Sequence, residues 1–130
     1  MRHDPVIRIT VVDVANRPYL RFPDVRGDAL TFVTDGDVWI GSVERAEAWR
    51  LGVGPALIHN PRLSPDGGTV AWASNAAGPT EVWVAPVFGG EPQRLTWWGD
   101  QGTTLLGWLR DGRPLAATAQ TAWHPWDRWA

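Results

Sequence analysis

The chain has 130 residues, of which 44% are hydrophobic and 20% charged, which suits a globular domain with a buried core and excludes a disordered chain. Its formal net charge of -2 gives no electrostatic basis for binding nucleic acid or a membrane surface, and the lack of cysteine excludes disulfides and thiolate metal sites. No apolar run approaches the ~20 residues that span a bilayer, and residues 1–14 do not have the pattern of a secretory signal, so we expect a cytoplasmic protein.

The first 18 residues stand apart from the rest of the chain. Residues 6–14 have the composition of a strand, interrupted by Arg8 and Asp13. We expect either one strand here that pairs with the edge of a sheet, or an extension with no fixed place.

Residues 19–52 predict four short strands, at 19–25, 29–34, 37–43 and 48–51. These segments are rich in Val, Ile, Phe, Trp and Thr, which favour a pleated surface. The second and third segments are separated by Asp35-Gly36, a pair that accepts the positive φ of a tight hairpin turn. The pattern therefore predicts an antiparallel sheet rather than helices.

Residues 57–98 predict a second set of four strands, at 59–63, 69–74, 81–86 and 93–97. The run Val70-Ala71-Trp72-Ala73 is apolar at every position, as expected when both faces of a sheet are covered. A third set begins with strands at 104–109 and 114–118 and runs out near 123–130, where its third strand should form.

The sets repeat at a spacing of about 44 residues, which is typical of propeller blades. Three short motifs recur at this spacing: Asp37-Val38-Trp39-Ile40 with Glu81-Val82-Trp83-Val84, Arg50-Leu51 with Arg94-Leu95, and Asp66-Gly67 with Asp111-Gly112. We therefore predict an all-β fold, a partial β-propeller of about two and a half four-stranded antiparallel blades at 19–52, 57–98 and 103–130.

An incomplete ring poses a problem of closure, because a propeller covers its blade faces by packing each blade on the next. About two and a half blades leave two broad apolar faces and an unpaired strand edge. We therefore expect the chain either to be the N-terminal piece of a longer protein, with the remaining blades as its partner, or to self-associate.

The second unit resembles the blade repeat of TolB-like and tricorn-like propellers. The residues that carry this resemblance are Pro61-Arg62-Leu63-Ser64-Pro65-Asp66-Gly67, Glu81-Val82-Trp83-Val84, Gly89-Gly90 and Arg94-Leu95-Thr96. The first unit resembles the opening blade of tricorn protease homologues, at Tyr19-Leu20-Arg21-Phe22-Pro23, Gly27-Asp28, Phe32-Val33, Asp37-Val38-Trp39 and Arg50-Leu51. The two resemblances, with the third unit, cover residues 19–130.

Tricorn proteases are large cytoplasmic serine peptidases that trim oligopeptides, and their propellers act as channels or filters to an enclosed active site. The resemblance implies that this chain supplies the start of the first propeller and binds or filters peptides on their way to an active site that it does not itself contain. No catalytic residue is therefore carried over to this sequence.

The resemblance also directs attention to the loop after the second unit. In the archaeal member, arginines after the second blade help to anchor the carboxylate of the substrate's C-terminus. Residues 97–102 here have Asp100 and no arginine, so the sequence does not predict this anchoring at that site. The candidate residues for contact with a ligand or peptide are Trp97, Trp98, Asp100 and Gln101.

The residues alone predict no catalytic, metal or cofactor site. The three histidines, His3, His59 and His124, are scattered and give no triad or ligand spacing, and no glycine-rich phosphate loop is present. We expect His59 to pack or to hydrogen-bond beside an inner strand, and Ser64 to support the turn at Asp66-Gly67.

Ten tryptophans leave other functions open. We expect Trp39, Trp72, Trp83 and Trp108 to pack between sheets, because they lie within strand patterns. The C-terminal cluster of Trp123, Trp126 and Trp129 would pack on a further sheet or form an aromatic surface. Two alternatives to the peptidase-associated propeller therefore remain: a non-enzymatic TolB-like interaction propeller, and a Trp-rich, self-associating, lectin-like module.

Overall fold

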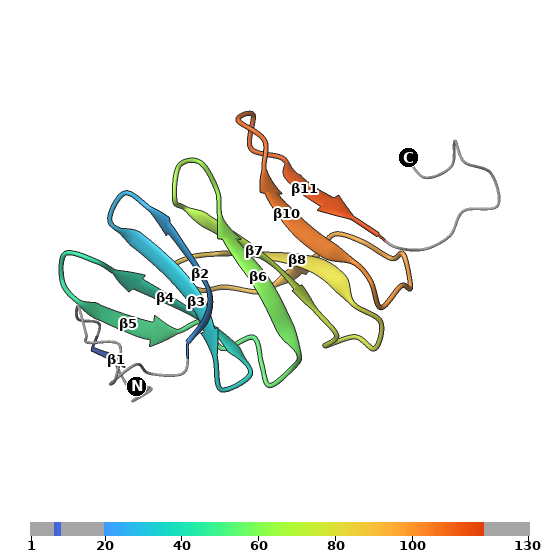
Figure 1. Ribbon diagram of the computed structural model, residues 1–130, viewed down its shortest axis with the longest axis horizontal. Helices are drawn as coiled ribbons and strands as arrows, with labels where there is room; N and C mark the ends of the chain where they lie inside the picture. The colour runs from blue at the N-terminus through green and yellow to red at the C-terminus, as the bar shows by residue number, and fades with distance from the viewer. Residues whose placement is uncertain (1–6, 9–19, 119–130) are drawn as a thin grey trace.

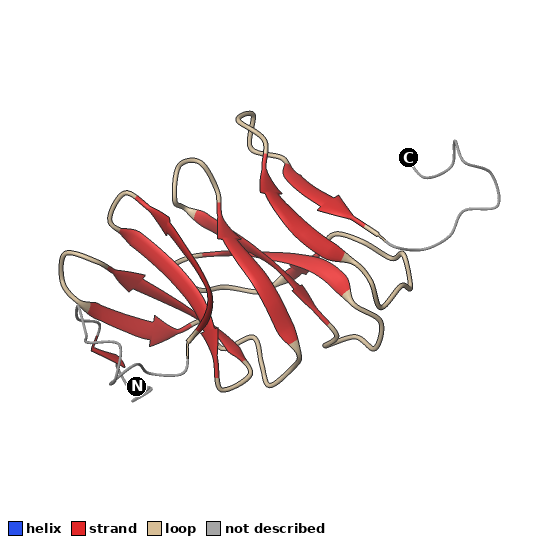
Figure 2. Cartoon of the chain, viewed as in Figure 1, coloured by secondary structure: helices blue, strands red, loops and turns tan. Residues whose placement is uncertain are grey.

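The computed structural model describes residues 7–8 and 20–118, and every regular element among them is a β-strand. Figure 2 shows these strands joined by turns and loops. In the part of the chain that the structure describes, no helix is long and apolar enough to cross a membrane. The all-β fold class that the sequence predicts is therefore confirmed.

The first sheet has the strand order β1-β5-β4-β3-β2. Its strands are β1 (Ile7–Arg8), β2 (Arg21–Arg26), β3 (Ala29–Thr34), β4 (Asp37–Ser42) and β5 (Glu47–Arg50). β1 pairs antiparallel with the edge strand β5, with Ile7 opposite Ala48. The structure thus contains a short strand within the predicted segment 6–14, whose other residues lie outside the described ranges.

The second sheet has the order β6-β7-β8-β9, and the third is the pair β10-β11. Their strands are β6 (Ile58–Leu63), β7 (Thr69–Ser74), β8 (Glu81–Pro86), β9 (Gln93–Arg94), β10 (Thr104–Trp108) and β11 (Pro114–Ala117). β3, β7 and β8 have the bounds that the sequence predicts. β9 ends at Arg94 instead of residue 97. The Leu95 amide still donates to the Val82 carbonyl oxygen of β8, but the Thr96 hydroxyl and the Trp98 amide bond to the Glu81 carboxylate in place of the strand ladder.

The three sheets follow one another along the molecule, and β2, β6 and β10, the first strand of each set, lie side by side (Figure 1). Side chains alternate between the two faces of a strand, so each sheet has two surfaces to cover. The first and second sheets enclose one apolar cluster between them. Its buried members are Val33, Val38 and Ile40 of the first sheet and Ile58, Leu63, Val70, Trp72, Ala85 and Val87 of the second sheet and its following turn.

The second sheet is covered on its other face as well. Ala71 and Val82 pack there with Leu105 of β10, and Trp108 and Ala116 lie against this cluster. The second sheet is therefore enclosed between the other two, as its continuous apolar run at residues 70–73 predicts.

The two outermost faces differ from each other. On the face of the first sheet that points away from the second, a separate cluster is buried, with Leu30, Phe32, Trp39 and Ala48 as its members. The third sheet leaves Leu106, Leu109 and Leu115 exposed. The expectation of two open apolar faces is therefore met on the third sheet, whereas on the far face of the first sheet this cluster is buried and Val25, opposite Leu30, is exposed.

The linker from β5 to β6 lies against the turn between β3 and β4. The Ala56 amide donates to the Gly36 carbonyl oxygen at 3.1 Å. A Cβ atom added at Gly54 would lie 1.9 Å from that same oxygen. Only glycine fits at this close approach of two backbone segments, so Gly54 allows the linker to β6 to pack against the β3–β4 turn.

We expect the Gly54→Ala variant to lower the free energy of unfolding by about 1–3 kcal/mol, because the new methyl group must displace backbone rather than a flexible side chain. Urea denaturation of the two proteins measures this difference. The matched control is Gly68→Ala, where the added Cβ would meet nothing closer than 3.4 Å. The control should change stability by less than about 1 kcal/mol, and equal losses in both variants would contradict the packing described here.

Candidate functional site

The four residues that the sequence predicts as contacts all lie in the linker between β9 and β10. Trp97 is 69% exposed, and the guanidinium carbon of Arg94 lies 5.0 Å from the centroid of its ring. This distance is within the range of a cation–π interaction. Trp97 therefore presents an aromatic ring to solvent, and Arg94 holds that ring in place.

The other three candidates are engaged within the fold. The Trp98 amide donates to Glu81 at 3.0 Å. One carboxylate oxygen of Asp100 accepts the Gly102 amide at 3.1 Å, and the other accepts the hydroxyl of Thr118. The exposed Gln101 pairs weakly with the Thr80 hydroxyl at 3.4 Å. The structure thus brings the four residues together in one linker, and their contact with a ligand stays a prediction.

Glu81 at the start of β8 is the anchor of this linker. Its side chain is fully buried, with 0% exposed. Its carboxylate accepts hydrogen bonds from the Thr96 hydroxyl at 2.6 Å, the Gly99 amide at 2.9 Å, the Trp98 amide at 3.0 Å and the Arg94 guanidinium at 3.0 Å. Burial by itself raises the pKa of Glu81, but the four donors outweigh burial and hold its pKa below the ordinary value.

The first sheet repeats this arrangement with Asp37, which lies at the start of β4. One of its carboxylate oxygens accepts the Val38 amide at 2.8 Å and the Val53 amide at 2.9 Å. The other oxygen lies 3.8 Å from Nε of Arg50, whose guanidinium carbon is 5.3 Å from the Trp39 ring centroid. In both sheets a buried acid holds the start of the linker that leads to the next sheet.

The repeat in the sequence aligns these acids and arginines but does not by itself predict a role for them. Asp37 matches Glu81 and Arg50 matches Arg94, all at the 44-residue spacing. An acid in a strand that is otherwise apolar needs a partner when it is buried. The recurrence of an arginine thirteen residues after each acid was therefore the available signal for this pairing.

The inner strands β2 and β6 each contain an irregularity that the sequence did not predict. The pairing register shifts between Arg21 and Asp24 in β2 and between His59 and Arg62 in β6. Phe22 and Asn60 occupy these bulges with φ of 54° and 52°, and each is followed by proline. Such bulges redirect side chains and bend the strand. In the sequence, the only sign of these bulges is the match between Phe22-Pro23 and Asn60-Pro61, a residue followed by proline in each inner strand.

Contacts across the inner strands join neighbouring sheets. The Leu63 amide of β6 donates to Asp24 of β2 at 2.8 Å. The Asn60 side-chain amide donates to the Thr104 hydroxyl of β10 at 3.0 Å, and Nε1 of Trp108 donates to the Arg62 carbonyl oxygen at 2.9 Å. These bonds join the three inner strands into one continuous surface.

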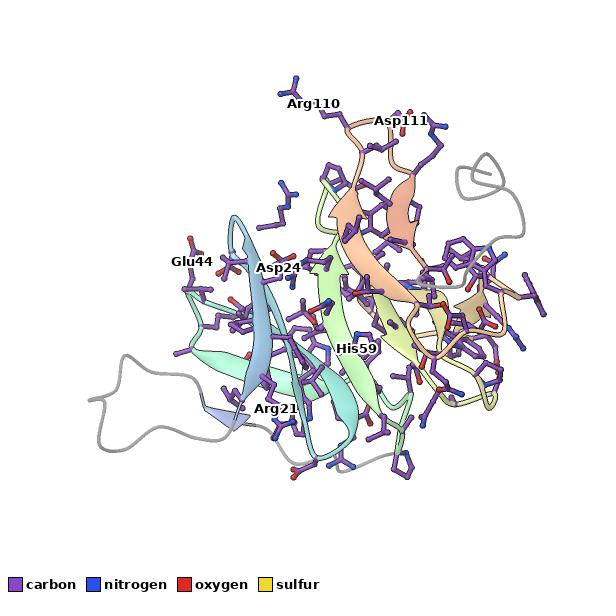
Figure 3. All side chains as sticks on the ribbon, turned by 45° about the vertical axis from the view of Figure 1, so that its right-hand side comes forward. Arg21, Asp24, Glu44, His59, Arg110 and Asp111 are labelled. Carbon is purple, nitrogen blue, oxygen red and sulfur yellow. The ribbon has the colours of Figure 1, made fainter. Side chains whose placement is uncertain are left out.

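His59 lies on this surface beside Phe22. Their ring centroids are 6.3 Å apart and the rings are tilted by 59°. Partial burial lowers the pKa of His59, so its ring is neutral at pH 7. Figure 3 shows Arg21, Asp24 and His59 on the two neighbouring inner strands, with Arg110 and Asp111 away from them on the β10–β11 turn. The expected packing role of His59 is confirmed.

Other side chains singled out in the sequence have structural roles. The Ser64 hydroxyl donates to Asp66 at 2.6 Å and accepts the Thr69 amide at 3.0 Å, which confirms its place in the turn. Trp72 is buried between the first two sheets, and Trp83 and Trp108 are partly buried against the clusters between sheets. Trp39 is also buried, but on the far face of the first sheet and not between two sheets as expected. Among residues 7–8 and 20–118, no group of three His, Cys, Asp or Glu side chains could hold a metal ion.

The remaining candidates of the sequence analysis are not placed. His3 and His124, together with the C-terminal cluster of Trp123, Trp126 and Trp129, lie outside the described residues.

Comparison with known proteins gives a consistent result. Residues 17–130 match the family described as the tricorn protease N-terminal beta propeller domain. Tricorn protease homolog 1 of Streptomyces coelicolor is 44% identical over 106 residues, which are 82% of this chain and 10% of that protein. A tricorn protease homolog of Saccharolobus solfataricus is 26% identical over 114 residues, covering 85% of this chain and 10% of that protein. The chain thus spans about a tenth of the length of these two relatives.

Solved structures show the same fold at lower identity. The crystal structure of the tricorn protease superposes with a TM-score of 0.66 at 23% identity, over 76% of this chain and 11% of that chain. TolB from Acinetobacter baumannii superposes with a TM-score of 0.65 at 13% identity, over 92% of this chain and 28% of that chain. Both likenesses support the propeller arrangement of the sheets.

We expect the Glu81→Gln variant to lower the free energy of unfolding by about 3 kcal/mol at pH 7, because it leaves Arg94 without its charged partner and turns one acceptor into a donor. Urea denaturation measures the loss. The matched control is Glu91→Gln, an exposed glutamate near the β8–β9 turn, for which we expect a change within about 0.5 kcal/mol.

The original chain and the Glu81→Gln variant also test the charge of Glu81, when their free energies of unfolding are compared at several pH values. Because its folded-state pKa is depressed, its contribution is complete above the ordinary glutamate pKa of about 4.3 and is lost as the pH falls through the folded-state pKa. The stability difference between the original chain and Glu81→Gln should therefore stay constant at neutral pH and shrink as the pH falls below about 4.3. A difference that is the same at every pH would show that the charge of Glu81 does not stabilise the fold.

Proposed function

Because the chain belongs to the family of tricorn protease N-terminal β-propeller domains, we propose that it binds extended oligopeptides on its inner strands and guides them toward an active site carried outside this chain. The same proposal places the protein in the cytoplasm, with the remaining blades and the catalytic region of a tricorn-like peptidase as its partners. The catalytic chemistry belongs to those other parts and none of it is assigned to residues here.

The observation that carries the proposal is the continuous surface of β2, β6 and β10. In a propeller, the innermost strands of the blades surround the central channel. Here these strands are cross-linked by Asp24, Asn60 and Trp108, and their bulges bring side chains of unlike chemistry to the surface. A fixed wall with both apolar and hydrogen-bonding groups suits an extended peptide of variable sequence.

The linkers that join one sheet to the next also help to position the inner strands. The buried acids Asp37 and Glu81 hold the chain as it passes from one sheet to the next inner strand. The exposed leucines of the third sheet suit the packing of a further blade, since exposed apolar patches mark sites of association. Both features fit a segment that works as part of a larger ring.

The proposal predicts weak peptide binding that is localised to the inner strands. We expect an oligopeptide of mixed sequence to bind with a dissociation constant of about 0.1–1 mM, since a passage must release what it binds. Amide chemical shifts recorded by nuclear magnetic resonance during the titration should change in β2, β6 and β10, and should not change in the β8–β9 turn.

Shift changes confined to the turns would favour the alternative of a propeller that docks folded proteins on its rim. Saturable binding of a glycan, with no peptide binding, would favour the lectin-like alternative. Either result, or the absence of any peptide binding, would contradict the proposed function.

A further inference from the structure

Phe22 has a backbone conformation that its side chain does not favour. A φ of 54° is uncommon for any residue other than glycine, asparagine or aspartate, and it is a genuine outlier for a bulky one. The bulge of β6 has Asn60 in the corresponding place, with a φ of 52°. The fold therefore uses a tolerant asparagine at this place in the second inner strand and a strained phenylalanine in the first.

Burial does not explain this phenylalanine. Phe22 is 37% exposed and belongs to none of the clusters between the sheets, whereas Phe32 in the adjacent strand is 1% exposed and is part of one. A strained conformation that persists without compensation in the core is a reason to look for a role in function.

The surroundings of Phe22 have the character of a binding site. The tilted ring pair with His59 gives two aromatic surfaces, and burial keeps His59 neutral. The bond from Leu63 to Asp24 fixes the two strands that carry the rings. A cleft between the first two sheets begins directly beside the pair, at the preceding residues Arg21 and Ile58.

Resting on the proposed function, we propose that Phe22 and His59 form a subsite that takes an aromatic side chain of the bound peptide. The two tilted rings match the edge-to-face and offset geometries in which aromatic groups associate. The neutral imidazole and the apolar phenyl ring carry no charge that would select an acidic or basic side chain. The subsite thus gives the inner wall of the propeller a preference among peptide sequences.

Two labelled heptapeptides test this subsite by fluorescence anisotropy with the full chain. One has phenylalanine at its third and fifth positions with glycine and serine elsewhere, and the other has serine in place of both phenylalanines. We expect the first to bind about five- to tenfold more tightly than the second. The Phe22→Asn variant places the residue of β6 in β2, and we expect it to remove this preference without weakening binding of the serine peptide.

The same variant separates binding from folding. Because asparagine tolerates the positive φ, the strain that it relieves offsets the contacts that the partly buried ring loses, so Phe22→Asn should leave the Tm within about 2 °C of the original value. Phe88→Asn is the matched control, since Phe88 is 89% exposed in the turn after β8, away from the inner strands. It should keep both the Tm and the preference for phenylalanine.

Four outcomes would overturn the subsite. If both peptides bind the original chain equally, the proposed function stands and the subsite is wrong. If the preference survives in Phe22→Asn, the aromatic side chain is bound elsewhere. A Tm that falls by more than about 5 °C in Phe22→Asn would make Phe22 a structural residue. If neither peptide binds, the proposed function fails and the subsite fails with it.

Discussion

The apolar contact between the first two sheets is the interaction on which the rest of the structure depends. Val38 and Ile40 from β4 meet Leu63 and Trp72 from the next sheet in one cluster, and each fully buried side chain of this kind contributes about 1.5–3 kcal/mol. A single four-stranded sheet cannot cover its own faces. Stacking therefore holds the sheets face to face, and this stacking places the three inner strands side by side.

Apolar contact is not directional, so another feature must determine where each sheet begins. Asp37 and Glu81 do this with directed hydrogen bonds to the linkers that follow their sheets. Gly54 permits the close approach of the first linker to the preceding hairpin turn. The outcome is a continuous surface on β2, β6 and β10, whose cross-strand bonds hold the bulges and the ring pair of Phe22 and His59 in fixed positions. The packing of the sheets and the hydrogen bonds of the linkers thus together position the surface that we propose binds peptides.

The sheets could be predicted from the sequence because the motifs that recur most closely lie in the buried central strands. Asp37-Val38-Trp39-Ile40 and its counterpart recur together with their turns, so strand bounds in the centre of each sheet agree with the structure. The end of β9 could not be predicted, because buried hydrogen bonds to Glu81 compete there with strand pairing.

Phe22 was missed for a different reason: its positive φ contradicts the preference of phenylalanine, and local preferences fail most often at functional or strained positions. The predicted contact residues lie in one linker, where Trp98 and Asp100 also serve the fold.

Hydrogen exchange in an Ile40→Ala variant tests most directly whether the stacked sheets form one unit. Ile40 lies in β4 of the first sheet, and its side chain is part of the cluster shared with β7. If stacking couples the sheets, the opening free energies of the protected amides in β4 and in β7 should fall together, by about 2–4 kcal/mol. Loss of protection in β4 alone, with β7 unchanged, would show that the sheets are independent and would contradict the account.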